Sequence, residues 1–209
     1  MLADVAKDEG EALAQELDAS HPGMAVFRHH DVSDEGAWTS LVEQTVDRWG
    51  PVTVLANNAG ILRDRMIYNT TEEEWDIVIA VHLKGHFACL KPAAQIFRQQ
   101  RSGRIVNTSS ESGLGNMGQG NYAAAKEGIT GLTRVAALDL GRYGVTCNGI
   151  RPRAGTRLTL NPELLEQMKK SREMAQEGES SDTAEALGGG IGGDQLKPEN
   201  VAPFVTWLC

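Results

Sequence analysis

Short apolar segments alternate with amphipathic helical patterns along most of this chain, and that alternation restricts the possible fold more than any other feature. The expected strands are residues 2–5, 24–32, 52–60, 103–110 and 145–152. The expected helices are residues 7–17, 34–50, 72–100, 121–140 and 197–209. This order predicts an α/β fold, a doubly wound parallel sheet with helices on both faces. Ligands bind such sheets beyond the carboxyl ends of the strands.

Local signals refine two of these helices and the region after the last strand. Ser33 is the expected N-cap of the second helix, and Pro92 is expected to bend the third. Residues 161–177 form a charged helical pattern. Residues 178–195 are rich in Gly, Ser and acidic side chains, which predicts a mobile loop.

The overall composition argues against some classes of partner and site. The chain has 209 residues and a net charge of −8. Neither nucleic acid nor a membrane is therefore expected as its main partner, because nucleic acid and anionic membranes both reward clustered Lys and Arg. The three cysteines, Cys89, Cys147 and Cys209, lack metal-ligand spacing, so reduced thiols and no metal site are expected. No apolar run is long enough to span a membrane and no signal-peptide pattern is present, so we expect a cytoplasmic location.

One pair of residues suggests acid–base chemistry. Tyr122 and Lys126 are four residues apart in "NYAAAK", which places both side chains on one face of the expected helix. A free tyrosine has a pKa of about 10, and a nearby ammonium group favours the phenolate. Taken alone the spacing is common, and it also suits an ordinary helix surface.

The surrounding motifs favour the catalytic interpretation. "NTSS" ends at Ser110, "NNAG" spans residues 57–60, and "CNGIRPRAGT" follows the next expected strand. In this order, and over nearly the whole chain, these motifs resemble the short-chain dehydrogenase/reductase family. The resemblance implies a Rossmann-like fold in which Tyr122 is the acid/base, Lys126 lowers the pKa of Tyr122 and holds the nicotinamide ribose, and Ser110 polarises the substrate oxygen. Ser109 is a rival for the last role, but Ser110 occupies the S-x-x-G position.

The same resemblance implies a set of cofactor-binding residues. They are Asp4, Asp31, Val32, Asn57, Ala59, Gly60, Tyr122, Lys126 and Pro152. Asp4 lies near the end of the expected strand 2–5, where in this family a carboxylate would bond the adenosine ribose 2′-hydroxyl and repel a 2′-phosphate. NAD is therefore expected in preference to NADP. The alternative for Asp4 is an ordinary turn residue at a strand end.

Two departures from the family pattern point to a branch of it. His82 stands in "VHLKGHF" where most members have an asparagine that supports a proton relay, and Arg153 replaces a usual glycine. A histidine can relay protons, although a packed helix histidine is equally compatible with the sequence. The motifs resemble the 3-hydroxyacyl-CoA dehydrogenase units of peroxisomal-type multifunctional enzymes and also 3-oxoacyl-carrier-protein reductases. Both imply a small-molecule substrate, a 3-hydroxyacyl or 3-oxoacyl thioester.

The chain is expected to be an incomplete member of that family. The glycine-rich turn of the family's first βα unit is absent, so the sheet should be divided where its first strand would lie, and the last strand is also missing. We expect one incomplete domain over residues 1–209, with residues 153–198 as its substrate-loop or lid region. Homodimers or homotetramers are expected through helices 72–100 and 121–142. The alternative function is a non-catalytic module that binds a protein partner.

Overall fold

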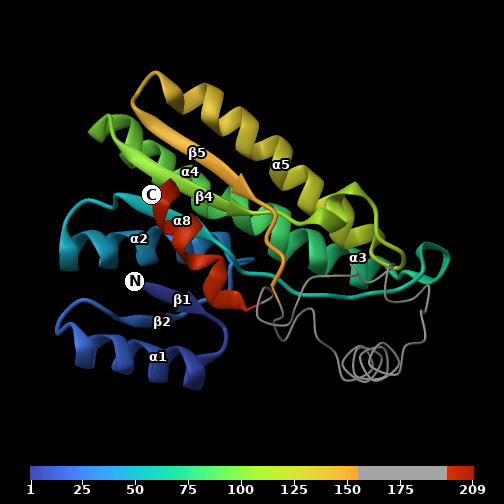
Figure 1. The fold of residues 1–209 in the computed structure, drawn as a ribbon, viewed down its shortest axis with the longest axis horizontal. Coiled ribbons are helices and arrows are strands. Elements are labelled where there is room, and N and C mark those ends of the chain that lie inside the picture. Colours follow the sequence, from blue (N-terminus) through green and yellow to red (C-terminus); the bar gives the residue numbers. More distant parts are fainter. Residues whose placement is uncertain (155–196) are drawn as a thin grey trace, which may run out of the picture. The chain divides into compact units, whose positions relative to one another are not determined.

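The computed structural model describes residues 1–154 and 197–209. The described strands are β1 (Leu2–Asp4), β2 (Phe27–His29), β3 (Val54–Asn57), β4 (Gly103–Thr108) and β5 (Val145–Ile150). The described α-helices are α1 (Lys7–Ser20), α2 (Glu35–Trp49), α3 (Glu72–Ile79), α4 (Gly85–Gln100), α5 (Gly120–Gly141) and α8 (Ala202–Leu208). Strands and helices alternate as predicted (Figure 1). The expected helix 161–177 and loop 178–195 lie outside the described residues.

The chain divides into two compact units. Met1–Arg151 with Leu208–Cys209 form the first, and Pro152–Trp207 form the second. The first unit contains all five described strands, and the second contains most of α8 and a short 3₁₀ turn at Pro198–Asn200. The boundary falls next to the expected start of the lid region. That the whole chain acts as one domain remains a prediction.

All described strand pairs are parallel, and they form two separate sheets. β1 pairs with β2, whereas β4 lies between β3 and β5. Ile105 at the centre of β4 is in register with Leu55 and Cys147. Among the described residues, one edge of β1 and one edge of β3 have no partner strand. The division of the sheet between β1 and β3 matches the division expected from the sequence.

The N-cap of the second helix lies one residue later than expected. Asp34, not Ser33, is the N-cap of α2, and its Oδ1 accepts hydrogen bonds from the backbone N–H groups of Gly36 and Ala37 at 2.9 and 3.3 Å. The hydroxyl of Ser33 donates to Asp31 instead, at 2.7 Å. The prediction was wrong because both residue types are good caps and the sequence placed two of them in succession.

The expected long helix from residue 72 to residue 100 is interrupted, but not at proline. α3 ends at Ile79, a π-helical turn spans Ala80–Lys84, and α4 follows. Pro92 lies inside α4 without ending it. The expected bend near Pro92 is therefore replaced by a π turn two to three turns earlier, and such turns are frequent at functional sites.

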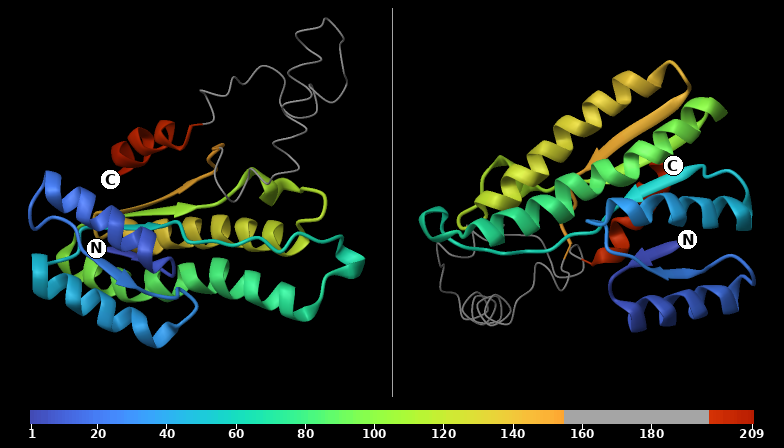
Figure 2. Two further views of the ribbon diagram at one scale, coloured as in Figure 1. Left: turned by 90° about the horizontal axis from the view of Figure 1, so that it is seen from below. Right: turned by 180° about the vertical axis from the view of Figure 1, so that it is seen from behind.

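The main core lies between the three-stranded sheet and the helices α4 and α5, which run side by side along it (Figure 2). Its buried members are Leu90, Ala93, Phe97, Ile105, Ala136, Leu140, Val145 and Cys147. Gly103 is required at the start of β4, because a Cβ there would lie 2.3 Å from Cγ of the fully buried Phe97. This core fixes the end of β4 against α5, and the candidate site is built at that junction.

Candidate active site

Tyr122 and Ser110 lie at the carboxyl end of the three-stranded sheet. Ser110 follows β4 and accepts a hydrogen bond from the backbone N–H of Ser112 at 3.2 Å, while Tyr122 lies in the first turn of α5. Burial is the main cause that raises the pKa of the half-buried Tyr122, and the negative charge of Asp64 adds to it. The hydrogen bond of Ser110 acts in the opposite direction and favours the phenolate. Tyr122 is therefore a protonated phenol in this structure.

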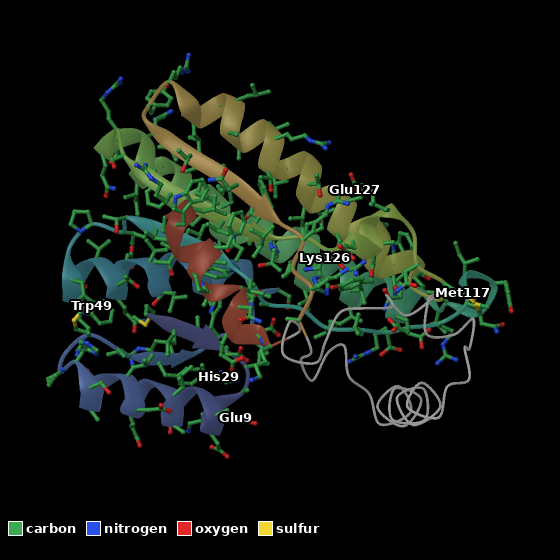
Figure 3. All side chains as sticks on the ribbon, viewed as in Figure 1. Glu9, His29, Trp49, Met117, Lys126 and Glu127 are labelled. Carbon is green, nitrogen blue, oxygen red and sulfur yellow. The ribbon has the colours of Figure 1, made fainter. Side chains whose placement is uncertain are left out.

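Lys126 is buried behind Tyr122. Its Nζ lies 5.4 Å from the centre of the Tyr122 ring and donates to the carbonyl oxygen of Thr108 at 2.7 Å (Figure 3). Burial lowers the pKa of Lys126 to about 8. The pKa of Tyr122 is raised and not lowered as expected, because burial outweighs the opposing hydrogen bond of Ser110.

The structure distinguishes the two candidate serines. Ser109 is 4% exposed, and its hydroxyl donates to the carbonyl oxygen of Lys126 at 2.7 Å and lies 3.0 Å from Oγ1 of Thr130. It therefore fastens β4 to α5. Ser110 is the serine that hydrogen-bonds Tyr122. The geometry favours Ser110 as the residue that meets a substrate oxygen.

His82 is fully buried beside the site. Its Nε2 lies 2.8 Å from the carbonyl oxygen and 3.0 Å from the backbone nitrogen of Ile61, and its ring meets that of Tyr122 edge-on with centroids 5.1 Å apart. Burial, with the charge of Lys126, lowers the pKa of His82 to about 4. His82 is thus a neutral imidazole that contacts Tyr122, and its expected relay role stays a prediction.

The two carboxylates expected at the adenosine end lie at the carboxyl ends of β1 and β2. Asp4 is exposed, and its Oδ1 accepts the backbone N–H of Ala6 at 2.9 Å. Asp31 accepts the hydroxyl and the backbone N–H of Ser33, and these bonds are the main cause that lowers its pKa. Val32 bonds Nε1 of Trp38 through its carbonyl at 3.2 Å.

The remaining expected cofactor residues differ in how free they are to meet a ligand. The Asn57 side chain is hydrogen-bonded within the protein interior: it donates to Oδ1 of Asn107 at 2.9 Å and accepts from the thiol of Cys89 at 2.6 Å. Only its backbone remains for a cofactor. Ala59 and Gly60 are half-buried. Pro152 is the first residue of the second unit.

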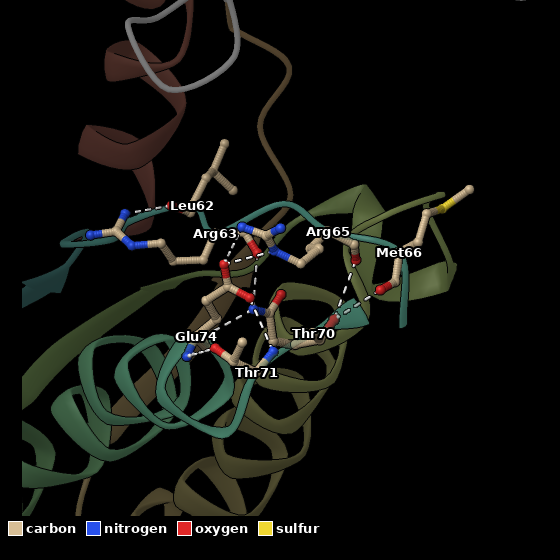
Figure 4. A network of polar contacts seen from close by, with 8 residues as sticks. Leu62, Arg63, Arg65, Met66, Thr70, Thr71 and Glu74 are labelled. Atoms are coloured by element: carbon tan, nitrogen blue, oxygen red, sulfur yellow. Dashed lines mark hydrogen bonds and ion pairs between the residues drawn. The ribbon is translucent and has the colours of Figure 1, made fainter. Parts of the chain in front are cut away.

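Sequence reasoning missed Asn121, the buried neighbour of Tyr122. Its Nδ2 donates to the carbonyl oxygens of Arg63 and Glu74, each at 3.1 Å, and its Oδ1 accepts the backbone N–H of Tyr122 at 2.7 Å. Glu74 also forms an ion pair with Arg65 at 2.7 Å (Figure 4). This network fixes the loop after "NNAG" against the start of α5. No sequence signal separated Asn121 from an ordinary polar residue beside the tyrosine.

The residues present fit a nicotinamide cofactor at its two ends. Tyr122 and Lys126 lie at the end of β4 where a nicotinamide ribose would be held, and Asp4 lies where an adenosine ribose would be held.

Comparisons with known proteins agree with this geometry. A family model described as short chain dehydrogenase matches residues 1–167. Hydroxyacyl-CoA dehydrogenase ChsB1 of Mycobacterium tuberculosis is 48% identical over 166 residues, which cover 75% of this chain and 50% of that protein. Peroxisomal multifunctional enzyme type 2 of Mus musculus is 40% identical over 190 residues, covering 90% of this chain and 22% of the enzyme.

Two further relatives extend the comparison. 3-Oxoacyl-[acyl-carrier-protein] reductase FabG of Staphylococcus aureus is 38% identical over 186 residues, covering 87% of this chain and 75% of FabG. The crystal structure of levodione reductase matches with a TM-score of 0.74 at 35% identity, covering 85% of this chain and 70% of that one. The chain thus spans about half the length of ChsB1 and about a fifth of the multifunctional enzyme.

Among the described residues, no helix is long and apolar enough to cross a membrane. The resemblance and the Rossmann-like fold inferred from the motifs are both confirmed. The chain belongs to the short chain dehydrogenase family.

Proposed function

We propose that the protein is an oxidoreductase that transfers a hydride between NAD and the carbinol or carbonyl carbon of a 3-hydroxyacyl or 3-oxoacyl thioester. The observation that carries the proposal is the arrangement of Ser110, Tyr122 and Lys126 at the carboxyl end of β4. The relatives named hydroxyacyl-CoA dehydrogenase and 3-oxoacyl-[acyl-carrier-protein] reductase support the thioester class of substrate.

Ser110, Tyr122 and Lys126 have different roles around one substrate oxygen. Ser110 donates a hydrogen bond to that oxygen, and Tyr122 gives it a proton in the reductive direction or takes one in the oxidative direction. The pKa of Lys126 is about 8, so at neutral pH it carries the charge that favours the phenolate left when Tyr122 has given up its proton. The bound nicotinamide would supply or accept the hydride.

NAD is favoured over NADP by Asp4. Its carboxylate is exposed at the carboxyl end of β1, where it would accept a hydrogen bond from a ribose 2′-hydroxyl and repel a 2′-phosphate. The test compares the reaction rate with NAD and the reaction rate with NADP at equal cofactor concentration. A clear preference for NADP would contradict this part of the proposal.

The central test is the replacement of the acid/base hydroxyl in a protein extended at both ends. Tyr122→Phe should lower the rate of NADH formation from a 3-hydroxyacyl thioester by about 10² to 10⁴-fold, because general acid–base groups contribute that much. Tyr143→Phe is the matched control: it removes the same atom from a tyrosine packed between Arg101 and Arg142, and should leave the rate unchanged. A Tyr122→Phe protein that keeps most of its rate would rule out this role.

The division of the strands into two sheets gives some support to the second candidate, a non-catalytic module that binds a protein partner. In a protein extended upstream of Met1, cofactor binding separates the two candidates, because an enzyme of this class requires it and a partner-binding module does not. Titration of the protein with NADH, followed by the fluorescence of the nicotinamide, is the appropriate measurement.

A further inference from the structure

The π turn at Ala80–Lys84 is accompanied by an unusual side-chain hydrogen bond. In a regular α-helix, the carbonyl of residue 82 would accept the backbone N–H of residue 86. Here the carbonyl oxygen of His82 accepts the backbone N–H of Gly85, and Nδ1 of His86 lies 2.6 Å from the same oxygen. A carbonyl oxygen only accepts, so the proton of the neutral His86 ring must be on Nδ1. The side chain of His86 thus bonds a carbonyl group at the irregular turn.

That turn presents the ring of His82 to the site. The ring is fully buried, its Nε2 meets the backbone of Ile61 at 2.8 to 3.0 Å, and its edge faces the ring of Tyr122. Gly60 packs closely against the same ring, since a Cβ at that residue would lie 2.3 Å from Cε1 of His82. The position of the His82 ring is therefore determined by the backbone on one side and by the geometry of the π turn on the other.

We propose that His86 is a positioning residue of the active site: by donating its Nδ1 proton to the carbonyl of His82, it holds the π turn in the geometry that presents the His82 ring to Ile61 and Tyr122. This inference rests on the proposed function. His86 acts through His82 and has no role in proton transfer. It is 3% exposed, and burial lowers its pKa to about 3, so it stays neutral at physiological pH.

A simple packing role is the competing explanation, and an isosteric pair of variants separates the two. Thr and Val have nearly the same shape, but only Thr can donate to the carbonyl four residues earlier. The chain already uses this bond, from Thr45 to Leu41 and from Thr133 to Ile129, each at 2.8 Å. His86→Thr therefore retains the donor, whereas His86→Val removes it and leaves a cavity of similar size.

The experiment compares the two variants in kcat, KM and melting temperature. We expect His86→Val to lower kcat about tenfold or more, and His86→Thr to stay within about threefold of the wild type, because small misplacements of catalytic groups have large effects on rate. The two melting temperatures should fall together. Equal kcat values in the two variants, whether lowered or unchanged, would overturn the proposal.

Nitrogen NMR of the histidine rings tests the same idea without activity. His86 should be the Nδ1–H tautomer in the wild type, and the ring signals of His82 should shift in His86→Val but not in His86→Thr. An Nε2–H tautomer of His86 would overturn the positioning role even if the enzyme is active. An inactive wild type with the expected tautomer would overturn the proposed function instead, and leave the geometry of the turn supported.

Discussion

Ser109 and Ser110 are adjacent, yet one faces the core and the other faces the reacting groups. The hydroxyl of Ser109 is buried against α5, where it bonds the carbonyl of Lys126, while Ser110 bonds Tyr122. Strand geometry explains the difference, because successive side chains of an extended segment point in opposite directions. The two serines therefore allow the hydroxyl's catalytic and structural roles to be separated by single substitutions.

We expect Ser110→Ala to lower kcat by about 10² to 10³-fold, as when one preorganised donor to a developing oxyanion is lost. We expect Ser109→Ala to keep most of its rate and to lower the free energy of unfolding by about 1 kcal/mol, the usual contribution of one hydrogen bond. Steady-state kinetics and urea denaturation on both variants provide the check. A larger loss of rate in Ser109→Ala than in Ser110→Ala would reverse the assignment.

The positions of single residues could be predicted from the sequence better than their environments. The spacing of Tyr122 and Lys126 placed both on one helix face, and the S-x-x-G position selected Ser110. The direction of the Tyr122 pKa could not be predicted, because it depends on burial, which outweighs the opposing hydrogen bond of Ser110. Asn57 was expected to line the cofactor, but its amide is used inside the sheet.

At the scale of elements, the irregular turn between α3 and α4 is the feature that the sequence did not predict. Proline is a visible signal for a bend, whereas a π turn arises from tertiary contacts that no local pattern records. Leu83 in this turn packs against α5, since a Cβ on Gly128 would lie 2.9 Å from its Cδ2. Gly128 thus serves a contact within the chain.

Gly60→Ala should destabilise the turn and the site together. The added Cβ would lie 2.3 Å from Cε1 of the fully buried His82, so the ring must move, and we expect a loss of about 1–3 kcal/mol in the free energy of unfolding. Gly36→Ala is the matched control, because it adds the same methyl group to an exposed helical residue, where the nearest atom, Oδ1 of Asp34, would lie at an ordinary contact distance of 3.4 Å. That control should be neutral or stabilising by up to about 1 kcal/mol. Chemical denaturation of both variants measures their free energies of unfolding. Equal stabilities would contradict the tight packing inferred around His82.

At the scale of the whole molecule, exposed apolar side chains on α4 and α5 support the expected assembly. Phe87 on α4, and Val135 and Leu138 on α5, are 46%, 55% and 81% exposed. Val135 and Leu138 are three residues apart and share a helix face. We predict that α4 and α5 pair with a second copy of the chain across a two-fold axis, because two such helices form a four-helix interface with their symmetry mates.

Leu138→Asp should weaken that interface, since each of the two symmetry-related sites would then hold an unpaired charge. Sedimentation at micromolar concentration should show the wild type as a dimer or tetramer and the variant shifted towards monomer. Met24→Asp, at an exposed residue outside these helices, should leave the assembly unchanged. A wild-type protein that sediments as a monomer would contradict the prediction.

The division of the strands into two sheets leads to the last prediction, which concerns residues 1–209 expressed by themselves. β1 and β3 each have a free edge among the described residues, and an unpaired buried edge leaves backbone hydrogen-bonding groups unsatisfied. The glycine-rich turn expected of the family's first βα unit is also absent from the described residues, so a pyrophosphate would lack its usual helix N-terminus. Asp4, Tyr122 and Lys126 can hold only the two ribose ends of the cofactor.

We therefore expect this chain alone to be poorly stable and to bind NAD without useful affinity. A ligand raises the stability of the folded state by RT ln(1 + [L]/Kd), so weak binding leaves the melting temperature unchanged at millimolar NAD. The measurement is a thermal melt with and without NAD, run in parallel on a protein extended upstream of Met1. A cooperative melt of the short chain that rises clearly with NAD would contradict the prediction. It would mean that another segment of the chain supplies the pyrophosphate contacts and joins the two sheets.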